Sequence, residues 1–355
     1  MTHSDQQIAE IAASMREFGF PWPIMVNGET REIVAGNGRY LAAVRLGLPT
    51  VPVVEEPPLP PLPETPVTRR GDLWTLGNHR VLCGDATQLL DLHTVLEGMP
   101  ADAVWTDPPH NVAYEGEAGT IQNDALSDEA FAWFLKDAFS SLLRSMRPGT
   151  PIYVAHSDTG GFTFRRCFIE AGFKLSSCLI WHENALVLSR GDYHWQHEPI
   201  LYGWKPGAPH RWYGGRDKTT IHEFDGPAFQ QVGDREWQIV LGETTLIVRG
   251  TDLTVEPVRG TVFYEDKPAV NAEHPTMKPV ALIQRMLANS APRGAIVLDP
   301  FAGSGSTLIA CEALGLRGHM VELDERYVDV IVARWQNLTG KRATRVPAAA
   351  GEEGE

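Results

Sequence analysis

Two short segments of this sequence carry the residue types best suited to chemistry, and each follows an apolar run. The first, residues 106–110, reads TDPPH and follows the run 103–105; the second, residues 298–307, reads LDPFAGSGST and closes the run 295–298. Short apolar runs bounded by turn residues are typical of buried strands in a parallel sheet. Parallel sheets bind ligands beyond the carboxyl ends of their strands, so we expect the two segments to form one site.

The acidic, proline-stiffened turn has the acceptors to hold an amino group. An ionised Asp107 only accepts hydrogen bonds, and the carbonyl of Pro108 is a second acceptor beside it. Two such acceptors can hold both hydrogens of an exocyclic NH2 group, aim its lone pair at an electrophile and stabilise the developing positive charge. Pro109 continues the turn, and His110 adds a flat ring that can stack on a base. A Pro-Pro turn without chemistry would explain the tetrapeptide alone, but the glycine-rich segment in the same chain favours the chemical interpretation.

The glycine-rich segment fits a nucleoside better than a polyphosphate. Gly303 and Gly305 let the backbone approach a ligand closely, and the lysine of a phosphate-binding loop is missing. Glu322 lies nineteen residues after Gly303, on the next apolar run. An acidic group at about this offset suits the hydroxyls of a ribose. The alternative is an ordinary tight turn between a strand and a helix.

Length and composition are those of a globular protein. The 355 residues are 43% hydrophobic and 21% charged, and the apolar runs are too short to span a bilayer. We expect no signal peptide, because the N-terminal segment lacks a basic region followed by an apolar core. The four cysteines are scattered, which suggests neither a disulfide framework nor a metal site, and we expect a cytoplasmic protein. Because the net charge is −14, any contact with DNA must rely on a local basic cluster.

The distribution of apolar, proline and glycine residues divides the chain into several parts. Residues 1–54 predict a small α+β module, and residues 55–68 a proline-rich linker. Residues 69–341 alternate strand and helix patterns, which predicts an α/β fold whose parallel sheet carries helices on both faces. Residues 205–270 interrupt that alternation as an antiparallel insertion, and residues 342–355 predict a disordered tail.

The large domain has these predicted strands in chain order: 80–83, 103–105, 151–155, 174–181, 199–204, 295–298 and 319–323. Its predicted helices are 86–97, 128–146, 160–171, 279–290, 305–314 and 325–337.

In combination, these motifs resemble those of the β class of S-adenosylmethionine-dependent DNA amino-methyltransferases. The acidic-proline turn comes first, then the insertion, then residues 274–279, HPTMKP, and then the glycine turn. That order is similar to a circular permutation of the Rossmann-like methyltransferase sheet, and the resemblance covers residues 71–341. It implies a site-specific DNA methyltransferase with S-adenosylmethionine as cofactor and double-stranded DNA as partner, as in restriction-modification systems. Base flipping is implied as well, because a base inside a duplex cannot reach such a pocket.

The resemblance also assigns roles to individual residues, and no metal is among them. Asp107 and Pro108 would grip the target amine, in one catalytic turn with Pro109 and His110. The implied cofactor-binding residues are Asp85 for the adenine edge, Glu322 for the ribose, and Thr276, Lys278, Asp299, Phe301, Gly303 and Gly305 for the methionine part.

Two positions in the catalytic turn bear on the target base. An Asp at the position of Asp107 is associated with adenine N6 methylation, whereas Ser is associated with cytosine N4. His110 stands where the family usually has Tyr, Phe or Trp. We therefore expect a weaker grip on the flipped base, or compensation by another aromatic side chain such as Tyr114 or Trp181.

The start of the insertion holds the densest basic and aromatic cluster of the chain, a mixture that suits phosphates and stacked bases. The residues expected to bind DNA are Lys205, Arg211, Trp212, Arg216 and Lys218. A solvated loop whose tryptophan packs inward is the alternative interpretation.

Residues 1–54 resemble the N-terminal domain of the ParB/sulfiredoxin superfamily. The match rests on the helical pattern over 4–18, on residues 18–24 and on the turn 36–39, GNGR, which in that family meets phosphate at a helix N-terminus. The family's first strand is missing and Asn37 stands where His or Glu is common. The resemblance therefore implies a shortened accessory module for DNA contact or interaction. By analogy, its fusion to a methyltransferase is a pattern of phages and prophages.

Three other functions compete with adenine methylation. They are cytosine N4 methylation, a ParB-like DNA-binding or nuclease protein whose methyltransferase half is inactive, and modification of RNA. Homodimers are common in the resembled class.

Overall fold

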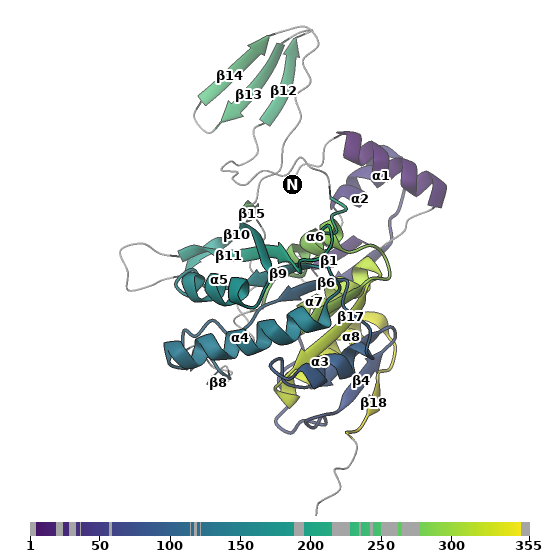
Figure 1. Ribbon diagram of the computed structural model, residues 1–355. Helices are drawn as coiled ribbons and strands as arrows, with labels where there is room; N and C mark the ends of the chain where they lie inside the picture. Colours follow the sequence, from purple (N-terminus) through teal and green to yellow (C-terminus); the bar gives the residue numbers. More distant parts are fainter. Residues whose placement is uncertain are drawn as a thin grey trace, which may run out of the picture. The chain divides into compact units, whose positions relative to one another are not determined.

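The computed structural model describes most of the chain and divides it into two compact units, each of which is treated separately. The described residues are 5–18, 24–27, 33–35, 37–56, 59–113, 115–116, 119–120, 122–187, 195–214, 228–233, 236–241, 244–249, 262–264 and 277–348. The smaller unit comprises residues 1–24, 36–53 and 216–262, and the larger unit comprises the remainder. Figure 1 shows the elements of both.

The larger unit is built on a ten-stranded mixed sheet of order β15-β10-β11-β9-β6-β16-β17-β5-β4-β18. Its centre is five parallel strands: β9 (Pro151–Ala155), β6 (Ala103–Thr106), β16 (Ile296–Asp299), β17 (Arg317–Glu322) and β5 (His79–Cys83). One flank is β11 (Trp195–Trp204), β10 (Lys174–Val187) and β15 (Val262–Tyr264), and the other is β4 (Leu73–Leu76) and β18 (Thr344–Val346). The two sequence motifs thus follow adjacent parallel strands, β6 and β16, as the sequence predicts.

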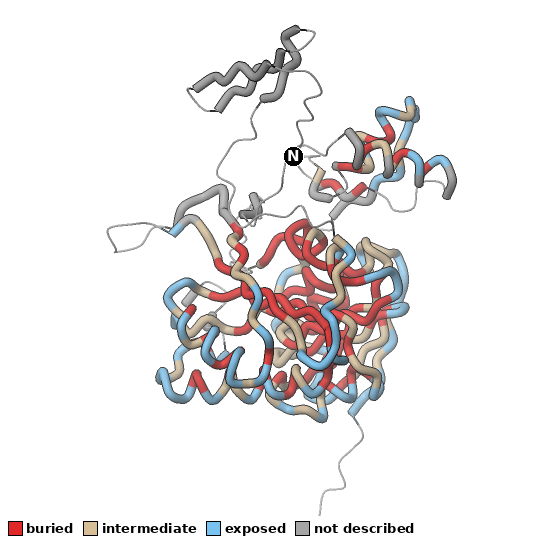
Figure 2. Tube along the Cα trace, turned by 45° about the horizontal axis from the view of Figure 1, so that its top comes forward, coloured by how far each residue is buried: buried red, intermediate tan, exposed pale blue. Residues whose placement is uncertain are grey.

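Helices cover both faces of this sheet. Alternate residues of each central strand point to opposite faces, so Trp105 and Val297 belong to one apolar cluster, and Val104 and Leu298 to another. The first cluster is covered by α6 (Val280–Ser290), α7 (Ser306–Leu314) and α8 (Glu325–Thr339). The second is covered by α3 (Leu89–Leu96), α4 (Asp128–Ser145) and α5 (Gly161–Glu170). Figure 2 shows the buried strands between helices whose outer sides are exposed. The predicted α/β fold is confirmed.

Capping residues and a glycine begin several of these helices after the carboxyl ends of the central strands. The side chain of Ser127 accepts a hydrogen bond from the Ala130 N–H and begins α4, and Asp324 accepts one from the Arg326 N–H and begins α8. Gly305, with φ at 86°, precedes α7. A small hairpin, β7 (Glu115–Gly116) and β8 (Gly119–Thr120), follows the acidic-proline turn.

The end of β10, the start of β11 and the tail differ most from the sequence prediction. β10 and β11 are longer than the predicted strands 174–181 and 199–204, because they pair with each other as an antiparallel ribbon that extends from Lys174↔Trp204 to Val187↔Trp195. The prediction that the tail is disordered from residue 342 onward is wrong for residues 342–348. There β18 pairs with β4, and the Arg345 guanidinium lies 2.8 Å from the buried Asp72 carboxylate. Residues 349–355 lie outside the described residues.

The N-terminal elements and the insertion form smaller structures. In the smaller unit, α1 (Asp5–Phe18) packs on α2 (Asn37–Arg45) through Ile8, Ala12, Met15 and Ala42. A three-stranded sheet of order β2-β1-β3 consists of β2 (Ile33–Ala35), β1 (Ile24–Asn27) and β3 (Val53–Glu56). The insertion holds an antiparallel sheet of β12 (Ala228–Gly233), β13 (Glu236–Leu241) and β14 (Thr244–Arg249). Among the described helices, none combines the length and the apolar character that a membrane span requires.

Candidate active site

A cavity of about 510 Å³ opens at the carboxyl ends of the central strands and brings both motifs together. The sequence-predicted residues that line it are Asp85, Asp107, Pro108, Pro109, His110, Lys278, Asp299, Phe301, Gly303 and Glu322. Gly305 follows this wall at the start of α7, and Thr276 lies outside the described residues. The volume of the cavity lies within the range of about 300–1,000 Å³ that is usual for small-molecule sites.

The glycine turn is held in place by the carboxylate that ends β16. Asp299 Oδ1 accepts a hydrogen bond from the Phe301 N–H at 3.1 Å, and its Oδ2 accepts one from the Thr307 hydroxyl at 2.5 Å. Gly303 and Gly305 have φ values of 51° and 86°, in the left-handed region that favours glycine. A Cβ atom at Gly303 would meet nothing within 4 Å, so the backbone there borders open space. Burial raises the pKa of Asp299 well above its usual value.

Glu322, which ends β17, connects the glycine turn to the next strand. Its Oε2 accepts the Gly303 N–H at 2.8 Å and its Oε1 accepts the Asp324 N–H at 2.9 Å. Each carboxylate oxygen has a second lone pair, so these bonds leave capacity to accept the hydroxyls of a ligand. Burial raises the pKa of Glu322 to about 7, although the backbone hydrogen bonds oppose that rise.

Asp85 lies just beyond the end of β5 and also lines the cavity. Its Oδ1 accepts hydrogen bonds from the Thr87 N–H at 2.9 Å and the Thr87 hydroxyl at 2.7 Å, and its own N–H donates to Asp91 Oδ2 at 2.6 Å. These contacts fix the acidic side chain at the position where the resemblance expects the adenine edge of the cofactor.

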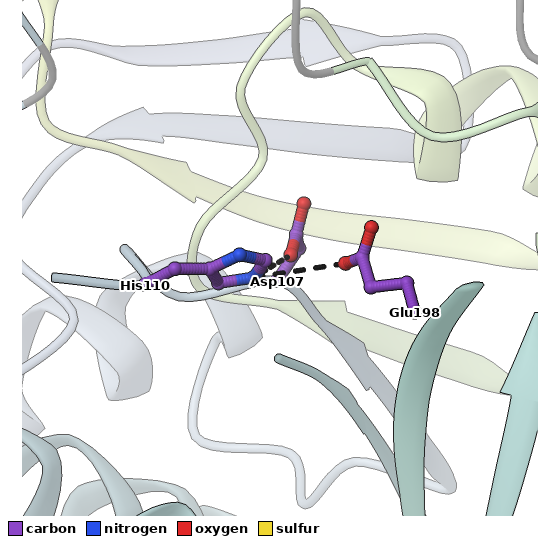
Figure 3. A group of neighbouring side chains, drawn as sticks. All are labelled: Asp107, His110 and Glu198. Carbon is purple, nitrogen blue, oxygen red and sulfur yellow. Dashed lines mark hydrogen bonds and ion pairs between the residues drawn. The ribbon is translucent and has the colours of Figure 1, made fainter. Parts of the chain in front are cut away.

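The acidic-proline turn is the centre of a cluster of charged groups. Lys278, which lies just before α6, is 2.8 Å from Asp107 Oδ2 and 2.9 Å from Glu198 Oε1. His110 Nε2 lies 3.1 Å from Asp107 Oδ1 and 3.7 Å from Glu198 Oε1. Figure 3 shows the imidazole of His110 facing both carboxylates. Glu198 comes from β11, so three separate elements meet at this point.

The charges of this cluster shift one another's pKa values. Burial alone would raise the pKa of Asp107, but the Lys278 ammonium and the hydrogen bond from His110 hold it well below its usual range. Burial alone would lower the pKa of Lys278, but the two carboxylates raise it above its usual value. Asp107 is therefore an ionised acceptor and a weak base, as its predicted role requires.

The same cluster has ligand atoms close enough to suggest a metal site, but a cation already lies between its carboxylates. The ligand atoms of Asp107, His110 and Glu198 all lie within 4.8 Å of one another. A metal ion bound there would have to displace the Lys278 ammonium from both carboxylates. We therefore interpret the group as an ion-pair network.

Glu198 and the aromatic residues Phe134, Trp195 and Tyr327 line this site but were not predicted from the sequence. Glu198 has a local signal, because it is an acidic residue at the start of the apolar run 199–204, which would otherwise predict a fully buried strand. The buried Trp181 lines the cavity, and so does Trp195 from β11. Tyr114, the other aromatic residue named for compensation, lies outside the described residues. The ring of His110 meets that of Phe164 edge to face, with centroids 6.2 Å apart.

Comparison with known proteins shows the family. Residues 101–333 match the family described as DNA methylase. The chain belongs to this family. Residues 1–56 of the methylase match the ParB N-terminal domain, and this agrees with the resemblance of that segment.

Individual relatives have low sequence identity to this chain but match most of its length. The type II methyltransferase M.HpaI of Haemophilus parainfluenzae is 24% identical over 258 residues, which is 72% of this chain and 74% of that protein. The DNA adenine methyltransferase YhdJ of Escherichia coli is 26% identical over 250 residues, 67% of this chain and 78% of that one. The crystal structure of an M1.HpyAVI–SAM complex superposes with a TM-score of 0.46 at 18% identity, and the match covers 72% of this chain and 97% of that chain.

The described part of the predicted DNA-binding cluster lies away from the cavity. β11 is antiparallel to β9, so the residues after Trp204 lie beside the start of β9, at the end of the sheet opposite the pocket. There the Lys205 ammonium donates to the Met146 carbonyl at 2.7 Å, and Arg211 donates to Asp102 Oδ1 at 2.9 Å.

Trp212 packs against the apolar cluster of α6, α7 and α8. For Trp212 this agrees with the inward-packing alternative, and DNA contact by Lys205 and Arg211 stays a prediction. Arg216 and Lys218 lie outside the described residues.

Proposed function

We propose that this DNA methylase transfers a methyl group from S-adenosylmethionine to the exocyclic N6 of adenine in double-stranded DNA. One observation carries the proposal: the acceptor turn at Asp107 and the glycine turn at Gly303 line one cavity. Membership of the DNA methylase family supports the reaction type. The relative YhdJ, named as an adenine methyltransferase, and the Asp at position 107 support adenine.

The residues of the cavity fit this cofactor. The open space at Gly303 lets a ligand lie against the backbone, and the acidic ends of three strands offer acceptors for polar groups along it. We propose that Asp85 accepts from the adenine amino group and Glu322 from the ribose hydroxyls. We also propose that the turn formed by Asp299, Phe301, Gly303 and Gly305 holds the methionine part, helped by Thr276 and Lys278 from the segment before α6. When bound, the cofactor supplies an electrophilic methyl group on a sulfonium.

The catalytic turn then positions the target nitrogen. Asp107 and the Pro108 carbonyl accept the two hydrogens of the flipped base's amino group, which directs the lone pair at the methyl carbon. With the methyl group transferred from the sulfonium sulfur to this nitrogen, the nitrogen would become cationic and would then lose one proton to solvent. Because Lys278 keeps Asp107 ionised, that carboxylate supplies negative charge and accepts a hydrogen bond, and it does not act as the base that keeps the proton. His110 and a cavity tryptophan supply planar surfaces for the extruded base.

Nucleoside analysis tests this function. Unmethylated duplex DNA is incubated with the protein and methyl-labelled S-adenosylmethionine, then digested and analysed by mass spectrometry, with RNA as a parallel substrate. N6-methyladenine from the DNA is the expected product. The Asp107→Ala variant should retain cofactor binding and lose methyl transfer, because it keeps the cofactor walls and removes the main acceptor. N4-methylcytosine, methylated RNA or no product would refute the respective part of the proposal.

The remaining parts of the chain have accessory roles in this proposal. We assign residues 1–54 to the ParB-like module, 55–68 to a linker, 69–341 to the methylase domain, and 205–270 to an insertion that recognises the target sequence. We also propose a cytoplasmic location, where such a protein would meet its duplex DNA substrate. We also propose a homodimer, supported by Trp133 and Phe162, which are 60% and 76% exposed on α4 and α5. Light scattering of the Trp133→Lys variant and the parent protein tests that dimer, because a charge in the interface should yield monomers.

A further inference from the structure

Two carboxylates share a single buried lysine in the catalytic cluster. The side chain of Lys278 is only 7% exposed, and its ammonium lies within 2.9 Å of both Asp107 and Glu198. Both carboxylates raise the pKa of Lys278, more through their charge than through their hydrogen bonds to the ammonium. The charge of Glu198 is therefore the larger part of its effect on Lys278.

The number of charges decides what the cluster can stabilise. The cluster sets two carboxylates, Asp107 and Glu198, against the single ammonium of Lys278, next to the position proposed for the target amine. Without Glu198, Asp107 and Lys278 alone would sum to zero. The amine gains positive charge as it is methylated, and a fixed negative charge in a desolvated site stabilises that change. A neutral ion pair in the same place would provide much less stabilisation.

We propose that Glu198 is a positioning residue for methyl transfer, acting through Lys278. It draws the ammonium to a shared position between two carboxylates, which leaves Asp107 with enough negative charge to hold the amine and to stabilise the cationic nitrogen. The inference rests on the proposed function. It also gives the extended antiparallel flank of the sheet a part in the reaction, because Glu198 lies on β11 and Asp107 follows β6.

Three variants separate the charge of Glu198 from its shape. Glu198→Gln keeps the shape and removes the charge, and Glu198→Asp keeps the charge and shortens the side chain. Glu97→Gln is the matched control, because Glu97 forms an exposed ion pair with Arg80 away from the cavity. Single-turnover methyl transfer to duplex DNA is measured at saturating cofactor, together with the Kd for S-adenosylhomocysteine and the thermal unfolding midpoint.

The expected result is a rate that depends on charge. Glu198→Gln should lower the single-turnover rate by about 10- to 100-fold, which is no more than the loss caused by removing a direct electrostatic donor. The Kd for S-adenosylhomocysteine should stay within about twofold of the parent value. Glu198→Asp should remain several-fold faster than Glu198→Gln, and Glu97→Gln should match the parent protein.

Distinct results would overturn the inference and the function on which it rests. A Glu198→Gln rate within twofold of the parent, or a Glu198→Asp rate at or below that of Glu198→Gln, would refute the role of charge while leaving methyl transfer intact. Absence of methyl transfer by the parent protein would refute the proposed function itself.

Discussion

Cofactor affinity should depend on pH through one carboxyl group, Glu322. Burial raises its pKa from 4.5 to about 7, so in the free protein this group is largely neutral below pH 7 and ionised above it. The ribose hydroxyls proposed to bind there donate more strongly to a carboxylate than to a neutral carboxyl group, so we take the ionised form as the competent one. The competent fraction is about 0.9 at pH 8 and about 0.1 at pH 6, and the apparent Kd rises as that fraction falls. We therefore expect cofactor binding to weaken about tenfold from pH 8 to pH 6.

Calorimetric titration with S-adenosylhomocysteine at several pH values measures this effect, because the product cannot react. The Glu322→Gln variant is the matched control: it keeps the side-chain size and cannot ionise, so its Kd should be weaker and nearly independent of pH. Two results would refute the reasoning. One is a parent Kd that stays constant between pH 6 and pH 8, and the other is an equal pH dependence in the variant, which would assign the titration to a different group.

Three further predictions concern the turn, the core and the target base. Gly305→Ala should lower the free energy of unfolding by about 1–3 kcal/mol, because its φ is 86° and the added Cβ would lie 3.0 Å from an isoleucine of α8. Gly303→Ala, which meets open space, should cost less in the same thermal or denaturant unfolding series. The hydrogen bond from His79 lowers the pKa of Glu312 from 4.5 to about 2. The ionised carboxylate therefore stabilises the fold above pH 4.5, and this stabilisation is lost as the pH falls towards 2. Glu312→Gln should flatten that part of the curve of unfolding midpoint against pH. His110→Tyr should change the fluorescence of a 2-aminopurine at the target position, because a larger ring holds a flipped base more strongly, and unchanged fluorescence would contradict that role.

Most elements of the large domain could be predicted because their signals are local. Apolar runs followed by turn residues located β6 and β16, and amphipathic spacing located α4 and α8 within a few residues of their observed bounds. The lengths of β10 and β11 could not be predicted, since their ends are fixed by pairing with each other. The tail was misjudged for the same reason, because β18 is stabilised by β4, which lies at the opposite end of the domain sequence.

The basic cluster of the insertion shows the limit of composition as a guide to function. Lys205 and Arg211 are close to aromatic residues in the sequence, which suggested a DNA contact. In the fold they follow a strand that runs antiparallel to the central ones, so they reach the end of the sheet remote from the cavity and interact with Met146 and Asp102. Residue type predicted their charge, and strand direction determined where that charge lies.

The sequence by itself determined the residue types at each strand end, because the acceptor turn at Asp107 and the glycine turn at Gly303 each consist of residues adjacent in the chain. Only the tertiary structure decided which charges act together. Glu198 and Lys278 reach Asp107 from β11 and from the start of α6, and coulombic interactions depend on distance in space rather than on separation along the chain.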